Sequence, residues 1–142
     1  IDPPDRLTAQ SFEKESVISS TTVSTLNSIL ARVVSEEGTA LKAHIPGYTI
    51  CGKTGTAQKF ENGRYSHSKF VASFIGFLPL ENPKVAILVN VDEPKGAYYG
   101  GAVAAPVFKE IAWRVVQYMG IPPQAASIAM RRMDENESKR TD

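Results

Sequence analysis

Apolar side chains recur at helical spacing in an early stretch of the chain. They are Val23, Leu26, Ile29, Leu30, Val33 and Val34. Steps of three and four residues put them on one face of a helix. Thr21 or Thr22 can cap its start and Gly38 can end it. The pattern therefore predicts a helix over about residues 22–37 that is apolar on one face.

A second apolar stripe predicts a helix from about Val103 to Met119. Gly120 follows it at the position where helices commonly end in a left-handed residue, and two prolines stand beyond. Pro106 would fall in the first turn, where a missing N–H is tolerated. The predicted stripe consists of Val107, Phe108, Ile111, Val115 and Tyr118.

Between the two helices, short apolar runs predict strands. Residues 70–78 and 85–91 are separated by an Asn-Pro turn, so they should pair antiparallel. Residues 48–51 have strand composition, and small and hydroxylated residues alternate from there to Gln58. Residues 60–69 are polar around an Asn-Gly turn and predict a loop. The order of helix, three strands and helix predicts an α+β fold, an antiparallel sheet flanked by helices.

The ends of the chain lack a clear period. Residues 1–20 predict an extended connection, and residues 21–122 carry all the predicted elements. From Arg131 on, eight of twelve residues are charged, four of each sign. Residues 123–142 therefore predict a solvated, disordered tail.

Composition narrows the classes of function. The 142 residues suit one domain or part of a larger one. Sixteen basic and fifteen acidic residues give a net charge of +1, which does not favour nucleic-acid binding. One cysteine, Cys51, excludes an internal disulfide and a zinc site with several thiolates, and it is expected to be a small buried apolar residue. We expect no metal and no cofactor.

The most informative stretch, residues 47–58, fits two signatures. Gly47, Gly52, Lys53 and Thr54 satisfy the phosphate-binding pattern G-x-x-x-x-G-K-[ST], and Asp92 could hold Mg²⁺ at the end of a strand. The context argues against a P-loop, because no apolar strand precedes the first glycine and no helical stripe follows the lysine. Nucleotide binding stays the alternative function.

The second signature is the triad Lys53-Thr54-Gly55, followed by Thr56, Ala57 and Gln58. Serine-acylating penicillin-binding proteins and β-lactamases carry such a triad. On an edge strand the side chains alternate, so Lys53 and Gly55 share one face and the two threonines share the other. A cation there favours an anionic substrate, glycine permits close approach of a substrate backbone, and hydroxyls can bind a carboxylate.

The segments around the triad strengthen this reading. They are Glu37-Gly38-Thr39, Ile45-Pro46-Gly47-Tyr48, Asp92-Glu93-Pro94 and Tyr98 to Phe108. In this order, over about residues 17–122, the chain resembles class B penicillin-binding proteins, the peptidoglycan D,D-transpeptidases of division type. A serine β-lactamase or carboxypeptidase is a near alternative, which the Tyr98–Phe108 segment disfavours. A non-catalytic module, in which the lysine strand only packs, is another.

The resemblance implies a role for each matching residue. Lys53 would assist the hydrogen-bond network of the catalytic serine, and the backbone N–H of Thr56 would supply half of an oxyanion hole. Tyr98 and Tyr99 would form an aromatic wall, although packing explains them equally well. The residues assigned to substrate binding are Thr54, Gly55, Thr56, Gln58, Tyr98 and Tyr99.

The resemblance also implies parts that this chain lacks. The nucleophile of the family is the serine of an S-x-x-K helix upstream of the triad, and an S-x-N element lies between. No S-x-N occurs here, and the strings Ser11 to Lys14 and Ser66 to Lys69 begin no apolar helix, so both are taken as chance. The chain alone should be inactive. With its upstream part it would bind peptidoglycan stem peptides and β-lactams, contact other division proteins, and lie in the periplasm on an N-terminal membrane anchor.

Overall fold

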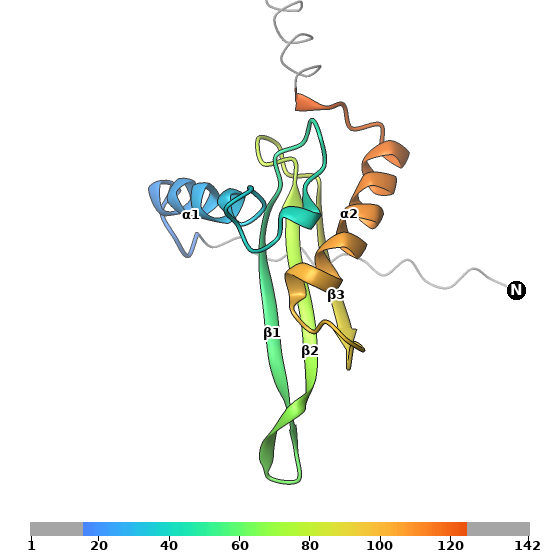
Figure 1. Cartoon of the computed structure of the whole chain (residues 1–142). Coiled ribbons are helices and arrows are strands. Elements are labelled where there is room, and N and C mark those ends of the chain that lie inside the picture. The colour runs from blue at the N-terminus through green and yellow to red at the C-terminus, as the bar shows by residue number, and fades with distance from the viewer. Residues whose placement is uncertain (1–15, 125–142) are drawn as a thin grey trace, which may run out of the picture.

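A computed structural model describes residues 16–124 of the chain (Figure 1). Helix α1 is followed by a 3-10 turn η1, strands β1, β2 and β3, and helix α2, so the predicted α+β order is confirmed. Helix α1 contacts β1, whereas α2 contacts all three strands. The elements are α1 (Ser20–Arg32), η1 (Leu41–Ala43), β1 (Cys51–Glu61), β2 (Arg64–Leu78), β3 (Val85–Asp92) and α2 (Gly100–Tyr118).

The three strands form one antiparallel sheet in the order β1-β2-β3. Strand β1 is therefore an edge strand among the described residues. The buried face of β2 carries Ala72, Phe74, Gly76 and Leu78, which pack toward α2. The intervening residues face the other way, where Ile75 of β2 and Leu88 of β3 are exposed partners in register.

The predicted loop over residues 60–69 is wrong, since these residues continue β1 and β2. Only Asn62 and Gly63 form the turn, and both have positive φ angles, of 52° and 80°. Two such residues make a tight hairpin whose twist matches the flanking strands. The segment is polar because most of it lies exposed, so composition indicated a loop although Phe60 pairs with Tyr65 and Glu61 with Arg64 across the hairpin.

The start of β1 is also later than the predicted strand over residues 48–51. Tyr48 makes only an isolated bridge with Ile45 and is buried. Its hydroxyl donates to the carbonyl of Ile121 at 2.7 Å. The β-favouring composition here reflects core packing, and the regular strand begins at Cys51.

The first helix is shorter than predicted and starts earlier. Ser19, not a threonine, caps it by accepting from the N–H of Thr22 at 3.1 Å. It ends at Arg32, and Val34 then turns into the core. No residue within α1 is buried, so the apolar face predicted for it lies exposed in the described structure.

The second helix begins at Gly100, three residues before its predicted start, so Pro106 lies past the first turn. The predicted stripe is wrong at three positions, because Val107, Ile111 and Tyr118 are exposed. Half of the buried residues of α2 are alanines, whose small side chains let the helix lie close to the sheet. The buried residues of α2 are Gly100, Ala104, Ala105, Phe108, Ala112 and Val116.

Residues 1–15 and 125–142 lie outside the described part of the chain, and with them most of the predicted extended connection and charged tail. Gln124 is described, and its side chain accepts from Thr49 at 3.0 Å and donates to Glu81 at 2.6 Å. None of the helices within residues 16–124 is long and apolar enough to cross a bilayer.

The core depends on one aromatic contact between sheet and helix. Phe74 and Phe108 are fully buried, with ring centroids 4.8 Å apart in an edge-to-face arrangement. We expect Phe74→Ala to lower the free energy of unfolding by about 3–5 kcal/mol, because it leaves a cavity against α2. Phe60→Ala is the control, since that ring is 63% exposed, and it should cost under about 1 kcal/mol. Urea denaturation measures both, and equal losses would contradict this assignment of the core.

Candidate active site

The candidate residues gather along the free edge of β1. Lys53 is exposed, on the face that it shares with Ile75, away from the core. Its ammonium reaches back over the strand edge and donates to the carbonyl of Thr54 at 3.0 Å and to its hydroxyl at 3.5 Å. The cation predicted for the site therefore lies at the edge of the strand that carries the threonines.

The two threonines face the opposite way, as strand alternation predicts. The hydroxyls of Thr54 and Thr39 are 3.1 Å apart, and Thr56 accepts from the backbone N–H of Gly100 at 3.2 Å. Thr39 comes from the loop after α1, and Gly100 is the first residue of α2. Both hydroxyls are therefore held by segments distant in the sequence.

Gly100 and Gly101 position the start of α2, and prediction did not single them out as site residues. A Cβ on Gly100 would overlap the carbonyl oxygens of Ser73 and Gly55. One on Gly101 would overlap the carbonyl oxygen of Thr39. The helix can approach β1 only without these side chains. The Gly-Gly pair at the start of an apolar stripe was the available signal.

An aromatic cluster lies over the central strand β2, next to β1. The rings of Tyr98 and Phe70 stack with centroids 4.3 Å apart, and Phe70 of β2 is the register partner of Gln58 in β1. Tyr98 donates its hydroxyl to that of Tyr99 at 3.3 Å, a hydrogen bond that raises the pKa of Tyr98. Tyr99 is 61% exposed and stands directly before Gly100, whose N–H bonds to Thr56 of β1.

The two S-x-x-K strings do not form a nucleophile site in the described residues. Ser11 to Lys14 lies outside them. Ser66 lies in β2, and its hydroxyl accepts from the backbone N–H of Ser68 and of Lys69. The ammonium of Lys69 bonds to Glu61 instead.

The geometry contradicts the P-loop alternative. Lys53 and Thr54 lie within a strand, where a P-loop requires the start of a helix. Asp92, the proposed Mg²⁺ ligand, pairs with Lys59 at 3.0 Å. Within residues 16–124 no group of three or more metal-ligating side chains occurs.

Cys51 is buried, as expected, at the start of β1. Its thiol donates to the carbonyl of Asn27 in α1 at 3.3 Å. Burial, with a smaller contribution from Glu81, raises the pKa of the thiol. The two histidines of the chain are both exposed, His44 directly after η1 and His67 in β2.

Comparison with known proteins decides the family. Residues 7–112 match the family model "Penicillin binding protein transpeptidase domain". The chain belongs to this family. The resemblance inferred from the triad and its flanking segments is thereby confirmed.

Relatives and solved structures agree. The chain is 40% identical over 121 residues to a probable peptidoglycan D,D-transpeptidase of Neisseria flavescens. This alignment covers 80% of this chain and 30% of the relative. The transpeptidase domain of Burkholderia pseudomallei penicillin-binding protein 3 is 41% identical, with a TM-score of 0.69 over 77% of this chain and 33% of that one. Penicillin-binding protein 3 of Mycobacterium tuberculosis, solved with ampicillin, is 33% identical, with a TM-score of 0.67 over 75% and 26%. The chain therefore spans about a third or less of each.

The close approach of α2 to β1 in this transpeptidase segment can be tested at Gly100. We expect Gly100→Ala to lower the free energy of unfolding by about 1–3 kcal/mol, because the new Cβ must displace the start of α2. Ala97→Ser, in the exposed loop just before, is the control and should change it by under about 0.5 kcal/mol. An unchanged urea midpoint for Gly100→Ala would contradict the packing described.

The burial of Cys51 predicts slow alkylation. At pH 8 iodoacetamide should modify the folded protein at least about tenfold more slowly than the same protein in urea, because the reactive thiolate is disfavoured and inaccessible. Since Cys51 is the only cysteine of the chain, mass spectrometry of residues 1–142 reads the rate directly. Equal rates in the two conditions would contradict a buried thiol.

Proposed function

We propose that this chain supplies the substrate-binding edge of a peptidoglycan D,D-transpeptidase that β-lactams inhibit. The observation that carries the proposal is the ammonium of Lys53 lying over the free edge of β1, 3.0 Å from the carbonyl of Thr54. Two residues further on, Thr56 is tied to the start of α2. A cation, hydroxyls and free backbone groups thus meet on one exposed strand edge.

The backbone of this edge suits an oxyanion. Along a strand, the polar groups of alternate residues point to the same edge. The carbonyl of Thr54 is reached by the lysine side chain, so the N–H of Thr56 is expected on that same free edge. There it would donate to the oxygen that becomes negative during acyl transfer.

The side chains would hold the substrate. Lys53 would stabilise the hydrogen-bond network of the serine, and the hydroxyls of Thr54 and Thr56 would bind a carboxylate after exchanging their present partners. Gly55 would let a peptide lie close because it has no side chain, and a Cβ there would also overlap the side chain of Ser73 in β2. Gln58, Tyr98 and Tyr99 would line the far end of the substrate, next to the stacked Phe70.

The reaction is acyl transfer in two steps. A serine oxygen attacks the carbonyl carbon of the penultimate D-Ala, the peptide bond to the terminal D-Ala breaks, and that residue leaves as the free amino acid with the proton from serine. An amine of a neighbouring stem peptide then attacks the acyl-enzyme and restores the serine hydroxyl. A β-lactam completes only the first step, because its leaving group stays attached.

The serine would come from an upstream part of the same protein. The exposed surfaces support this: Val23, Leu26 and Ile29 on α1, and Ile75 and Leu88 on the outer face of the sheet, are each 40–57% exposed. Apolar patches of this kind are normally covered. We infer that the rest of the transpeptidase domain covers them, in a protein anchored in the cytoplasmic membrane, facing the periplasm and acting with other division proteins.

The origin of the serine is tested by labelling with penicillin. In the full-length protein we expect a single adduct, equal in mass to the intact antibiotic, which peptide mapping places outside residues 1–142. The 142-residue chain alone should gain none, because it lacks the nucleophile. An adduct on Ser11 or Ser66 would contradict the assignment, and no adduct on the full-length protein would contradict the proposed function.

The role of Lys53 is tested by Lys53→Ala in the full-length protein. We expect the rate of acylation by penicillin to fall about 100-fold or more, because the positive charge beside the reacting groups is lost. Lys42→Ala is the matched control, since Lys42 is exposed in η1, and should acylate at the wild-type rate. Equal rates for both variants would favour a non-catalytic module in which the strand only packs.

A further inference from the structure

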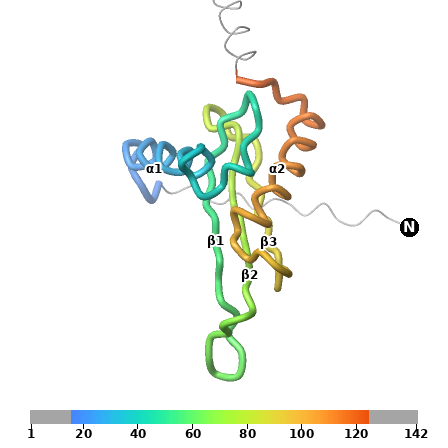
Figure 2. Tube along the Cα trace, viewed as in Figure 1, coloured from blue at the N-terminus to red at the C-terminus, as the bar shows by residue number. Residues whose placement is uncertain are grey.

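The hairpin of β1 and β2 extends beyond the third strand. Pairing between β2 and β3 ends at Val71 and Asp92, whereas β1 and β2 stay paired to Glu61 and Arg64 (Figure 2). Residues 58–70, the hairpin arm, therefore have two strands and, within residues 16–124, no third strand beside them. A two-stranded ribbon is marginally stable in water, so other contacts must fix its direction.

The arm starts at an irregularity in the pairing of β1 with β2. Gln58 pairs with Phe70 and Phe60 pairs with Tyr65, so one residue of β1, Lys59, stands opposite four residues of β2, 66–69. The extra residues therefore lie on β2, and an insertion of this kind bends the ribbon and disrupts its ladder locally. Lys59 stands opposite this insertion, three residues after Thr56.

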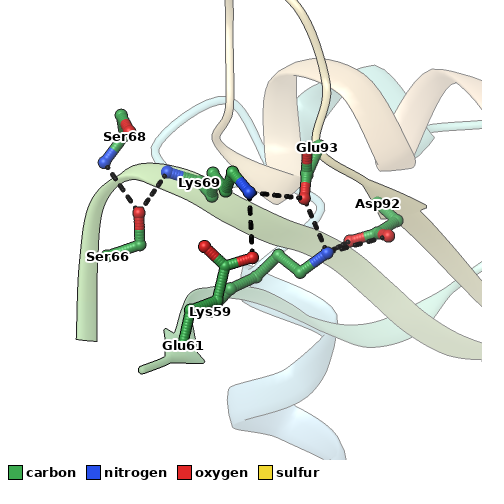
Figure 3. Close-up of polar contacts among 7 residues, drawn as sticks. All are labelled: Lys59, Glu61, Ser66, Ser68, Lys69, Asp92 and Glu93. Atoms are coloured by element: carbon green, nitrogen blue, oxygen red, sulfur yellow. Dashed lines mark hydrogen bonds and ion pairs between the residues drawn. The ribbon is translucent and has the colours of Figure 1, made fainter. Parts of the chain in front are cut away.

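The side chain of Lys59 crosses β2 to reach the end of β3 (Figure 3). Its ammonium lies 2.8 Å from the carboxylate of Glu93 and 3.0 Å from that of Asp92. Lys69, on the other strand of the arm, lies 2.9 Å from Glu61 and 3.8 Å from Glu93. These five residues, Lys59, Glu61, Lys69, Asp92 and Glu93, are called the clasp.

Glu93 joins the clasp to the aromatic wall. It has a positive φ of 47°, a conformation costly for a residue with a side chain, and its N–H donates to the carbonyl of Phe70 at 2.9 Å. Phe70 in turn stacks on Tyr98. The arm, the end of β3 and the loop before α2 are thus connected through one strained residue.

The ion pair of Lys59 and Glu93 stays charged over a wide pH range. Hydrogen bonds to Glu93 and Asp92 raise the pKa of Lys59, and the one from Lys59 lowers the pKa of Glu93. The charge of Glu93 therefore contributes to stability until the pH falls through a value below its ordinary pKa of 4.5. The charge of Lys59 contributes until the pH rises above its ordinary pKa of 10.5.

Lys59 is also the least exposed member of the clasp, with a side chain 25% exposed. Exposed pairs taken singly contribute little, but a network that shares one carboxylate restrains geometry.

We propose that the clasp is a positioning device for acyl transfer, in which Lys59 and Glu93 fix the course of β1 beyond Gln58 relative to the end of β3 and to the loop that carries Tyr98. The inference rests on the proposed function. Lys59 and Glu93 touch neither substrate nor serine, and act through the backbone of Thr56 and the aromatic wall. Small errors in the placement of an oxyanion donor cost rate more than affinity.

The test measures penicillin acylation of the full-length protein, with the non-covalent affinity and the acylation rate constant determined separately. For Lys59→Met, which keeps the length of the side chain, we expect the rate constant to fall about five- to tenfold while the affinity changes by less than about twofold. Glu93→Gln should act likewise. Lys59→Arg should restore the rate, and Lys84→Met, an exposed lysine before β3, is the matched control.

The double variant separates a shared interaction from two independent effects. If Lys59 and Glu93 act through one ion pair, Lys59→Met with Glu93→Gln should lose no more rate than the worse single variant. Losses that multiply, or a wild-type rate for Lys59→Met, would overturn the proposal.

If penicillin does not label the wild-type protein, the proposed function is refuted but the clasp is not. Hydrogen exchange then tests the clasp by itself. Amides of residues 57–61 should exchange faster in Lys59→Met than in Lys84→Met, because the arm loses its restraint. Equal exchange in the two variants would show that the clasp orders nothing.

Discussion

The contact on which the site depends is the approach of the first turn of α2 to the backbone of β1 and β2. Gly100 leaves no room for a side chain between the helix and the carbonyls of Gly55 and Ser73, and its N–H bonds to Thr56. This one contact sets the position of the loop before the helix, and so of Tyr98 and Tyr99. Because three of the six buried residues of α2 are alanines, the helix can follow its first turn onto the sheet.

The sheet combines an edge that must stay free with a face that must be covered. An unpaired strand edge invites association with other chains. Here the exposed edge carries Lys53, whose charge disfavours such pairing and whose ammonium occupies a backbone acceptor, Thr54. The proposed function uses the same property, since a substrate peptide could lie along an edge that no strand within residues 16–124 occupies.

Sequence patterns predicted the order of elements, the antiparallel pairing and the strand that bears the triad, because apolar periodicity and turn residues are local signals. The same patterns did not predict the length of the hairpin. Most of residues 60–69 are exposed on a two-stranded ribbon, and their polar composition is like that of a loop. They misplaced part of the α2 stripe, because alanine at 104, 105 and 112 packs the core while larger side chains face out. Local patterns also could not show that Thr39 reaches Thr54, a contact across fifteen residues.

Sequence motifs did not indicate the clasp. Asp92 fits the pattern of a Mg²⁺ ligand, and Asp92 and Glu93 belong to a segment that resembles the family, but neither pattern indicates Lys59 as their partner. That pairing occurs where the register of β1 and β2 shifts after Gln58 and where Glu93 has a left-handed backbone, two features that only the folded chain brings together. A long two-stranded arm close to a reactive strand would transmit its own bending to that strand. The clasp would restrain the arm at its base, where β3 ends. The proposed site on β1 would then stay fixed without a restraint on the turn at Asn62 and Gly63.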